Sequence, residues 1–358
     1  MKILTVLGAR PQFIKAAPLS RVLRKHHHEV LVHTGQHYDD NMSKIFFDEL
    51  SIPSADYNLG VGSDLPGKQI GVMLIKLEEV LDREKPDWVL VYGDTNSTLA
   101  GSLAAVKQHI PVAHIEAGLR SYDWQMPEEV NRVITDHLSA LLFCPAQAAV
   151  DNLAAESITK GVHIVGDVMF ESLTLAKSIA KNRSTILENL GLREKKYLLA
   201  TIHRAENTDH PERLKKILES FSYIDQQIIF PVHPRTRKVI SSLGLPVSQI
   251  SNLVMIDPVG YLDMIQLESS AEKILTDSGG IQKEAYWLGV PCITLRDRTE
   301  WIETISSGWN VLVGDDPAKL IEAVRKDDFP EQQLNLYGDG KATQLICQIL
   351  DEQARLLD

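Results

Sequence analysis

Residues 87–116 read DWVLVYGDTNSTLAGSLAAVKQHIPVAHIE. The apolar run 88–92 is followed by Gly-Asp-Thr, then by a helical pattern of small residues over 97–108. A second apolar run, 110–115, ends in an acid, Glu116. Short apolar strands that alternate with helices are typical of parallel sheets covered on both faces. This stretch therefore predicts an α/β fold and puts Asp94 and Glu116 at the ends of two strands.

The same alternation runs along the whole chain. The expected strands are 2–8, 29–35, 87–93, 110–116, 141–145, 197–203, 227–233, 252–257, 273–279, 291–295 and 309–314. The clearest helical patterns are 67–85, 97–108, 211–224, 316–326 and 342–357. A barrel needs eight strand–helix units that close on themselves, and no such repeat is present. We therefore expect two doubly wound domains, 1–169 and 170–341, with the last helix, 342–358, packing back on the first.

Length and composition limit the number of domains, the binding partners and the compartment that can be expected for this chain. A chain of 358 residues is too long for one ordinary core, which supports two domains. The net charge of −11 argues against general binding of nucleic acids or anionic membranes. The three scattered cysteines, Cys144, Cys292 and Cys347, suggest reduced thiols, and no apolar run approaches the ~18–20 residues of a membrane span. These features predict a cytoplasmic enzyme without a membrane-inserted segment.

Polar residues gather where the expected strands end. They are Gly8-Ala9-Arg10-Pro11-Gln12, Gln36-His37, Gly93-Asp94-Thr95, His114-Ile115-Glu116, His203-Arg204, His233-Pro234-Arg235, Asp277-Ser278-Gly279-Gly280 and Arg296-Asp297. In open parallel sheets the ligand crevice lies outside the carboxyl ends of the strands. Polar loops follow any strand, but the recurrence of Arg, His, Asp and Glu in both halves favours two sheets facing an interdomain cleft.

The stretch TDSGGIQKEAYWLG, residues 276–289, is the strongest ligand signal. Ser278, Gly279 and Gly280 follow a strand and begin a helix, where free N–H groups and the helix dipole suit a phosphate. Glu284, on the same helix, can accept hydrogen bonds from two ribose hydroxyls. A tight turn with an exposed glutamate is the alternative. There is no Walker motif and no G-x-G-x-x-G, which disfavours an ATPase or a dinucleotide enzyme.

The basic and acidic candidates each have a structural alternative. Arg10 and Lys15 are suitable cations for a diphosphate, or else they lie on a solvated helix face. Asp94 could simply cap the next helix, whereas this role is harder to give to Glu116. Glu128 could pair with Arg132 at i,i+4 in a first helical turn.

The histidines have structural alternatives as well. His203 and His233 end apolar runs, where a satisfied core histidine is the ordinary interpretation. The only H-x-H pattern joins His26 and His28 and lies at the start of a strand, where a solvated turn is expected. No H-E-x-x-H occurs, so we expect no catalytic metal.

Together these motifs resemble the non-hydrolysing UDP-N-acetylglucosamine 2-epimerases. The resemblance covers nearly the whole chain through GARPQFIK, TGQH, GDTNSTLAG, HIEAGLRS, MPEEVNR, TIHRAEN, VHPRT, DPVGYLD, LTDSGGIQKEA and LRDRTE. It implies the two-domain GT-B fold and a homodimer. It also implies epimerisation at C2 of a UDP-amino sugar without a cofactor, through loss and re-addition of UDP by way of a glycal.

The resemblance also implies roles for individual residues. The positions that match the family's catalytic residues are Asp94, Glu116, Glu128 and His203. Those expected around the diphosphate are Arg10, Lys15, His203, Ser278, Gly279 and Gly280. Glu284 is expected on the ribose, and residues 257–261, including Pro258 and Tyr261, are expected to line the uracil pocket. His233 is added as a substrate-binding candidate.

Some positions depart from the better-known bacterial members. Ala205 replaces the second arginine of HRRE, residues 299–303 read TEWIE instead of TERPE, and the segment after Gln36-His37 differs. These departures put an allosteric UDP-sugar site in doubt and resemble the branch that acts on UDP-2,3-diacetamido-2,3-dideoxyglucuronic acid. We expect UDP-N-acetylglucosamine as the substrate, with that uronic acid as the alternative. A GT-B glycosyltransferase is a more distant alternative.

Overall fold

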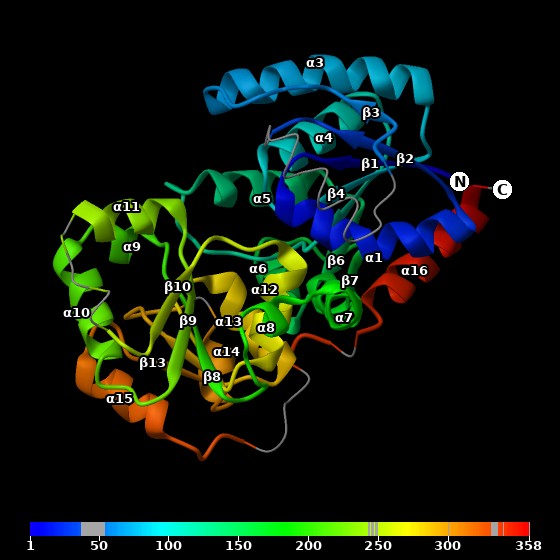
Figure 1. Cartoon of the computed structure of the whole chain (residues 1–358). Helices are drawn as coiled ribbons and strands as arrows, with labels where there is room; N and C mark the ends of the chain where they lie inside the picture. Colours follow the sequence, from blue (N-terminus) through cyan, green and yellow to red (C-terminus); the bar gives the residue numbers. More distant parts are fainter. Residues whose placement is uncertain are drawn as a thin grey trace. The chain divides into compact units, whose positions relative to one another are not determined.

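The computed structural model describes residues 1–36, 54–242, 244, 247, 250–299, 301–330, 336–338 and 340–357 (Figure 1). The side chains of Arg10, Leu356 and Leu357 lie outside this description. The chain divides into two compact units. Unit 1 comprises Met1–Leu175 and Asn335–Asp358, and unit 2 comprises Ala176–Leu334.

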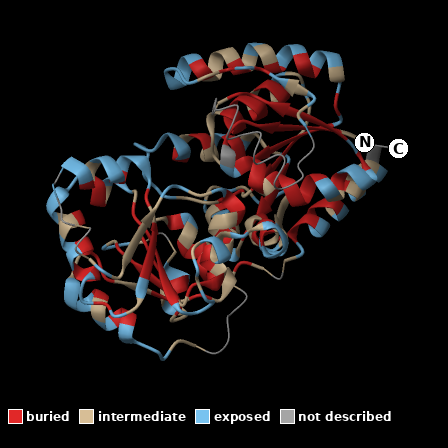
Figure 2. Cartoon of the chain, viewed as in Figure 1, coloured by how far each residue is buried: buried red, intermediate tan, exposed pale blue. Residues whose placement is uncertain are grey.

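Unit 1 is built on a seven-stranded parallel sheet with the order β3-β2-β1-β4-β5-β6-β7. Its strands are β1 Lys2–Leu7, β2 His28–His33, β3 Tyr57–Asn58, β4 Trp88–Tyr92, β5 Val112–Ile115, β6 Leu141–Cys144 and β7 Val162–Ile164. The central strands β4, β5 and β6 are buried along their whole length, as expected for strands covered on both faces (Figure 2).

The helices of unit 1 are α1 Arg10–His26, α3 Pro66–Glu84, α4 Asn96–Lys107, α5 Pro127–Leu138, α6 Gln147–Ala155, α7 Val168–Arg183 and α16 Ala342–Leu357. Helices α1 and α3 to α6 connect strands, α7 leads from β7 toward unit 2, and α16 comes from the end of the chain. Met73 and Leu77 of α3 are fully buried and share one core cluster with Val6 and Val91 of the sheet. Helix α16, from the end of the chain, lies alongside α1 (Figure 1). The division between the units falls inside α7.

Unit 2 repeats the design with a six-stranded parallel sheet of order β10-β9-β8-β11-β12-β13. Its strands are β8 Tyr197–Thr201, β9 Gln227–Pro231, β10 Leu253–Ile256, β11 Lys273–Thr276, β12 Cys292–Thr294 and β13 Asn310–Leu312. Its helices are α8 Ile186–Asn189, α9 Ala205–Thr208, α10 Pro211–Phe221, α11 Pro234–Ser242, α12 Tyr261–Ser270, α13 Gly279–Leu288, α14 Ile302–Ser306 and α15 Pro317–Arg325.

Both faces of this second sheet are covered, as the apolar runs require. Leu198 and Ala200 of β8 pack in one cluster with residues of α10 and α15. The alternating residues, Tyr197 and Leu199, pack in another cluster with residues of α12 and α13. The two doubly wound parallel-sheet domains predicted from the sequence are therefore confirmed.

All the strands expected from the sequence are present, and the described part of the chain forms two more. β3 has two residues, and the residues of β7 are half-buried or exposed, so neither makes an apolar run that a sequence pattern could reveal. Within the described residues, no helix combines the length and apolar character needed to cross a membrane.

Each sheet has one point where the strand order reverses. In unit 1 the chain builds outward from β1 through β2 on one side and then through β4 on the other. In unit 2 the same reversal lies between β8 and β11. Ligands of doubly wound sheets bind outside the carboxyl ends of the strands at such points. Ligand-binding residues are therefore expected in the loops after β1 and β4 of unit 1 and after β8 and β11 of unit 2.

Gly8, directly after β1, lies where the first of these loops is tightly packed. A Cβ at this position would collide with Ser97 Oγ and Thr34 Oγ1, which contact each other at 2.8 Å. We expect Gly8→Ala to lower the free energy of unfolding by about 1–3 kcal/mol, as overpacking does. Denaturant titration followed by circular dichroism measures the change.

Gly71→Ala is the matched control, because a Cβ there meets no atom within 4 Å on helix α3. This change should stabilise by roughly 0.5–1 kcal/mol, the helix preference of alanine over glycine. If Gly8→Ala were equally harmless, the close packing of the β1 loop would be wrong.

Candidate active site

The strand ends of unit 1 are tied together by the side chain of Gln12 on α1. Gln12 Oε1 accepts hydrogen bonds from the backbone N–H groups of Gly8 at 2.8 Å and Ala9 at 2.9 Å. Its Nε2 donates to Tyr92 O, at the end of β4, at 2.8 Å. The start of α1 is thus fixed against β4, so Lys15, one turn after Gln12, is held near the reversal point.

Lys15 forms a largely buried ion pair with Glu116, at the end of β5. Burial by itself lowers the pKa of the lysine, but Glu116, with smaller effects from Asp167 and Asp94, raises the pKa above its ordinary value. Gly93 lies against this pair, because a Cβ there would be 3.3 Å from Glu116 Oε2 and 3.8 Å from Lys15 Nζ. A charged lysine and a carboxylate therefore meet in a place that excludes most water.

The backbone of Glu116 is in the left-handed region, with φ of +70°. This conformation costs energy for a residue with a side chain, and such residues gather at functional sites. The N–H groups of Glu116 and Ala117 both donate to Phe143 O, at 3.1 Å each. The turn aims the Glu116 carboxylate at Lys15 instead of letting β5 continue.

A buried network supports the Glu116 turn on both sides. His114, two residues before it, contacts Asp136 Oδ1 through Nδ1 at 2.7 Å and Gly93 O through Nε2 at 2.8 Å. Asp136 Oδ2 accepts from the N–H of Gly118, two residues after it, at 3.0 Å, and from Arg120 at 2.7 Å. Burial alone raises the pKa of the Asp136 carboxyl, but His114 and Arg120 lower it below its ordinary value.

Asp94, after β4, forms an ion pair with Arg132 of α5. Its backbone oxygen accepts a hydrogen bond from Asn131 Nδ2 at 2.9 Å. It does not cap α4: Thr95 is the N-cap, and its hydroxyl accepts from Thr98 N at 3.3 Å. The capping role considered for Asp94 is therefore wrong, and its carboxylate is one-third exposed beside an arginine.

The two glutamates at the start of α5 have different surroundings. Glu129 is buried and accepts from the N–H groups of Ser121 at 2.9 Å and Tyr122 at 2.8 Å. Burial raises the pKa of the Glu129 carboxyl, but these hydrogen bonds and Arg132 lower it overall. Arg132 contacts Glu129 at 3.1 Å, so the expected i,i+4 pair between Glu128 and Arg132 is wrong. Glu128 is exposed and makes no hydrogen bond or ion pair with the described residues.

In unit 2 the buried carboxylate of Asp277, after β11, holds the loop after β8. It accepts from the backbone N–H groups of His203 and Arg204 and from Asn207 Nδ2, each at 3.0 Å. Asn207 also donates to Leu295 O, at the end of β12, at 3.0 Å. The His203 loop is therefore attached to two neighbouring strand ends at the reversal point of this sheet.

The two predicted histidines of unit 2 lie side by side. The ring centres of His203 and His233 are 6.0 Å apart, and His203 Nδ1 is 3.8 Å from Asp277 Oδ1. Burial lowers the pKa of His203, which Asp277 opposes and His233 reinforces. The His203 side chain is 38% exposed and His233 is exposed, so the core-histidine interpretation is wrong for both.

The start of α13 has the open form expected of an anion site. Ser278 is the N-cap, and its hydroxyl accepts from Ile281 N. Gly280 is exposed, and a Cβ there would meet only Ser278 Oγ, at 3.8 Å. Glu284 is half-buried one turn later, close enough to raise further the pKa of Glu268, which burial already holds well above its ordinary value.

Pro258 is exposed in the loop after β10, and Tyr261 is buried as the first residue of α12. The side chain of Arg10, together with His37 and Glu300, lies outside the described residues.

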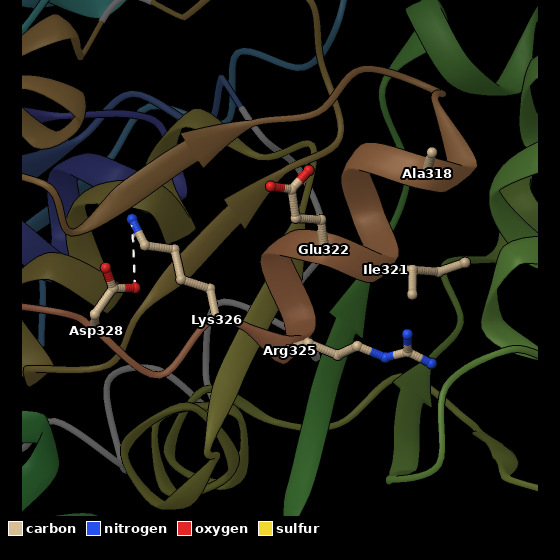
Figure 3. Close-up of a pocket in the computed structure, with 6 residues that line it drawn as sticks. All are labelled: Ala318, Ile321, Glu322, Arg325, Lys326 and Asp328. Atoms are coloured by element: carbon tan, nitrogen blue, oxygen red, sulfur yellow. Dashed lines mark ion pairs between the residues drawn. The ribbon is translucent and has the colours of Figure 1, made fainter.

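A surface hollow on α15 is separate from these residues. It is lined by Ala318, Ile321, Glu322, Arg325, Lys326 and Asp328 (Figure 3). Two of its lining residues, Lys326 and Asp328, form an ion pair at 3.7 Å. None of its lining residues follows the carboxyl end of a strand at a reversal point, so this hollow is not the candidate site.

Three supporting residues were not identified from the sequence: Arg120, Asp136 and Asp277 as an anchor of the His203 loop. Asp136 lies in the last turn of the amphipathic helix α5, where an acid normally faces water. Arg120 could have been identified from the HIEAGLRS motif, because it follows Glu116 by only four residues.

The chain matches the family model described as UDP-N-acetylglucosamine 2-epimerase over residues 21–351. The protein belongs to this family. A Methanococcus maripaludis protein named UDP-N-acetylglucosamine 2-epimerase homolog is 54% identical, over 98% of this chain and 99% of its own length. The UDP-2,3-diacetamido-2,3-dideoxy-D-glucuronate 2-epimerase of Pseudomonas aeruginosa is 48% identical, with 98% and 99% covered.

A solved structure gives the same result for the fold. The UDP-GlcNAc 2-epimerase of Methanocaldococcus jannaschii, in complex with UDP-GlcNAc and UDP, has a TM-score of 0.84 and 46% identity. The alignment covers 98% of this chain and 100% of that one. The family and the GT-B-like fold class predicted from the motifs are confirmed.

The lowered pKa values of Asp136 and Glu129 predict how stability depends on pH. Both carboxyls bind protons more weakly in the folded protein than in the unfolded chain. Their stabilisation is therefore complete above the ordinary carboxyl pKa of about 4 and is lost as the pH falls below it. Asp136→Asn should lower the free energy of unfolding at pH 7 by about 3–5 kcal/mol and flatten this acid dependence.

Denaturant titrations between pH 3 and 7 measure both effects. Asp82→Asn, on the exposed side of α3, is the control and should behave like the parent protein. An unchanged acid dependence in Asp136→Asn would show that the buried network does not carry it.

Proposed function

We propose that this protein epimerises a UDP-amino sugar at C2, converting UDP-N-acetylglucosamine to UDP-N-acetylmannosamine without hydrolysis. The observation that carries the proposal is the buried pair of Lys15 and Glu116 at the reversal point of the unit 1 sheet. The M. jannaschii relative, 46% identical, was solved with UDP-GlcNAc and UDP bound, which supports this class of substrate.

The chemistry explains why such a site is needed. The C2 hydrogen is not next to a carbonyl group, so its simple removal as a proton is very difficult. If the bond from C1 to the UDP oxygen breaks as well, the electron pair of the C2–H bond becomes the C1=C2 bond of a glycal. UDP leaves with the electron pair of the C1–O bond. Re-addition of UDP with a proton delivered to the other face of C2 gives the epimer.

Unit 1 carries the acids and bases for these steps in this proposal. Glu116, Asp94 and Glu128 are the carboxyl groups that take up and return the C2 proton. The raised pKa of Lys15 keeps it positively charged, so it stabilises the negative charge that develops on the departing diphosphate. Arg10, at the start of the same helix, is assigned to the diphosphate too.

Unit 2 binds the nucleotide in this proposal. Ser278, Gly279 and Gly280 offer the start of α13 to the diphosphate, and the exposed Gly280 leaves room for close approach. Glu284 binds the ribose, and Pro258 and Tyr261 line the uracil site.

The two histidines complete the assignment. The lowered pKa of His203 favours a neutral imidazole near pH 7, which can donate a hydrogen bond to a phosphate oxygen or transfer a proton. His233, beside it, is assigned to substrate binding.

A second substrate is supported by a specific observation. The P. aeruginosa relative, named for UDP-2,3-diacetamido-2,3-dideoxy-D-glucuronate, is 48% identical, and the M. jannaschii enzyme named for UDP-N-acetylglucosamine is 47% identical. These two sequence identities do not decide which of the two sugars is the substrate. Ala205 and Trp301 resemble the diacetamido branch, so that uronic acid is the alternative substrate.

We further infer a cytoplasmic homodimer that supplies a sugar for a cell-envelope polysaccharide. The free, buried thiols of Cys144, Cys292 and Cys347 suit a reducing compartment. The dimer rests on the family resemblance alone.

Exchange with solvent tests the reaction. We expect the protein, incubated with UDP-N-acetylglucosamine in D2O, to place deuterium at C2 while the UDP-sugar stays intact, as followed by NMR. The same experiment with UDP-2,3-diacetamido-2,3-dideoxyglucuronic acid decides between the two sugars. Absence of exchange with either would refute the epimerase, and accumulation of free UDP would indicate a hydrolysing enzyme.

Glu116→Gln tests the role of that carboxylate. We expect UDP affinity to be kept, whereas turnover falls by about 10²–10⁴-fold because a base has been removed. Calorimetric titration of UDP and the C2 exchange rate measure the two quantities. Asp123→Asn, an exposed acid in the same segment, is the control and should keep its turnover. Weakened UDP binding with full turnover would contradict the assigned role.

A further inference from the structure

A cluster of metal-binding side chains lies where α1 ends against α16, away from the strand ends. It consists of His26, the last residue of α1, with Cys347 and Asp351 of α16. One nitrogen, sulfur or oxygen atom from each lies within 4.8 Å of the others. We propose that these three residues form a binding site for a divalent transition-metal ion, with Zn²⁺ as the best match.

The arrangement of the two helices allows the three side chains to bind one metal ion. Cys347 and Asp351 are four residues apart on one helix, so their side chains lie on the same face, one turn apart. His26 approaches them from the second helix, with Nδ1 3.7 Å from Asp351 Oδ2. Zinc bonds of about 2.0–2.3 Å in tetrahedral geometry place donor atoms roughly 3.3–3.7 Å apart. The His26–Asp351 separation is already at this spacing, and the 4.8 Å limit on the other separations leaves about 1 Å for side chains to close around an ion.

His27 gives an independent indication. Its side chain is 3% exposed, and Nε2 lies 3.1 Å from Asp351 Oδ1, the second oxygen of the same carboxylate. Neither of its ring nitrogens makes a well-directed hydrogen bond within the described residues. A buried imidazole without hydrogen bonds is costly. An ion on Asp351 would fix the carboxylate so that His27 can donate to it, an arrangement common behind metal ligands.

The types of ligand select the metal. Mg²⁺ and Ca²⁺ prefer oxygen ligands throughout, whereas a set of imidazole, thiolate and carboxylate suits Zn²⁺. Three protein ligands leave one position for water. Lys15 lies eleven residues earlier on α1, about 16 Å along the helix. The site is therefore separate from the proposed chemistry and would join the two helices.

Cobalt titration of the metal-free, full-length protein tests the site. Co²⁺ is the probe because a thiolate ligand gives a charge-transfer absorption that nitrogen and oxygen ligands do not give. We expect saturation at one Co²⁺ per chain, displacement by Zn²⁺, and loss of the absorption in Cys347→Ser. His27→Ala should weaken binding by about 10–100-fold, as for residues that orient a ligand.

His26→Ala is the variant least able to disturb folding, because this side chain is 51% exposed. We expect it to weaken Co²⁺ binding at least ~10-fold, the lower end of the range for supporting residues. His137→Ala is matched to it: that histidine is 50% exposed and pairs with Glu156, outside the cluster. It should bind Co²⁺ like the parent protein.

Two outcomes would overturn the proposal. One is the absence of a thiolate absorption at saturating Co²⁺, which would leave His26 and His27 as simple ion-pair partners of Asp351. The other is equal affinity in the parent protein and in His26→Ala, which would place the bound metal elsewhere. Neither outcome bears on the epimerase, because C2 exchange is measured separately.

Discussion

In each unit, a buried carboxylate that accepts backbone N–H groups determines the shape of the loops that carry the candidate residues. Loops that leave a parallel sheet carry polar backbone groups into the interior, and these must find partners. Asp136 meets this need around the Glu116 turn, and Asp277 meets it for the His203 loop. Neither aspartate is assigned to substrate. Together they fix the positions of Glu116 and His203, so the geometry of the proposed chemistry depends on residues outside it.

The two units use similar folds for different electrostatic tasks. In unit 1 charged side chains meet each other, as Lys15 does with Glu116 and Asp94 does with Arg132. In unit 2 the start of α13 offers backbone groups and an exposed glycine. The carboxylates of unit 1 suit proton transfer, and the fixed dipoles at the start of α13 suit a diphosphate that must be held and released, with Lys15 adding positive charge in the proposal. The division of labour proposed for the units follows from this difference.

The sequence predicted features that depend on neighbours along the chain. The β5 strand and the acid that ends it form one local pattern, and so do the serine and glycines before α13. Features that depend on distant partners were missed. Arg132 pairs with Asp94, 38 residues away, and with Glu129 instead of Glu128, which the i,i+4 rule cannot anticipate. Asp136 looked like a surface acid because His114 and Arg120 approach it from another segment. The meeting of His26 with Cys347 depends on where the last helix packs.

The left-handed backbone of Glu116 has a consequence for how this protein can change. Glycine or asparagine would adopt that conformation more easily, so selection for thermal stability alone favours their appearance there. Either replacement would remove the carboxylate that faces Lys15. In the proposed mechanism this position is a trade-off between stability and activity, and in related chains its residue should separate those kept for catalysis from those kept only for binding.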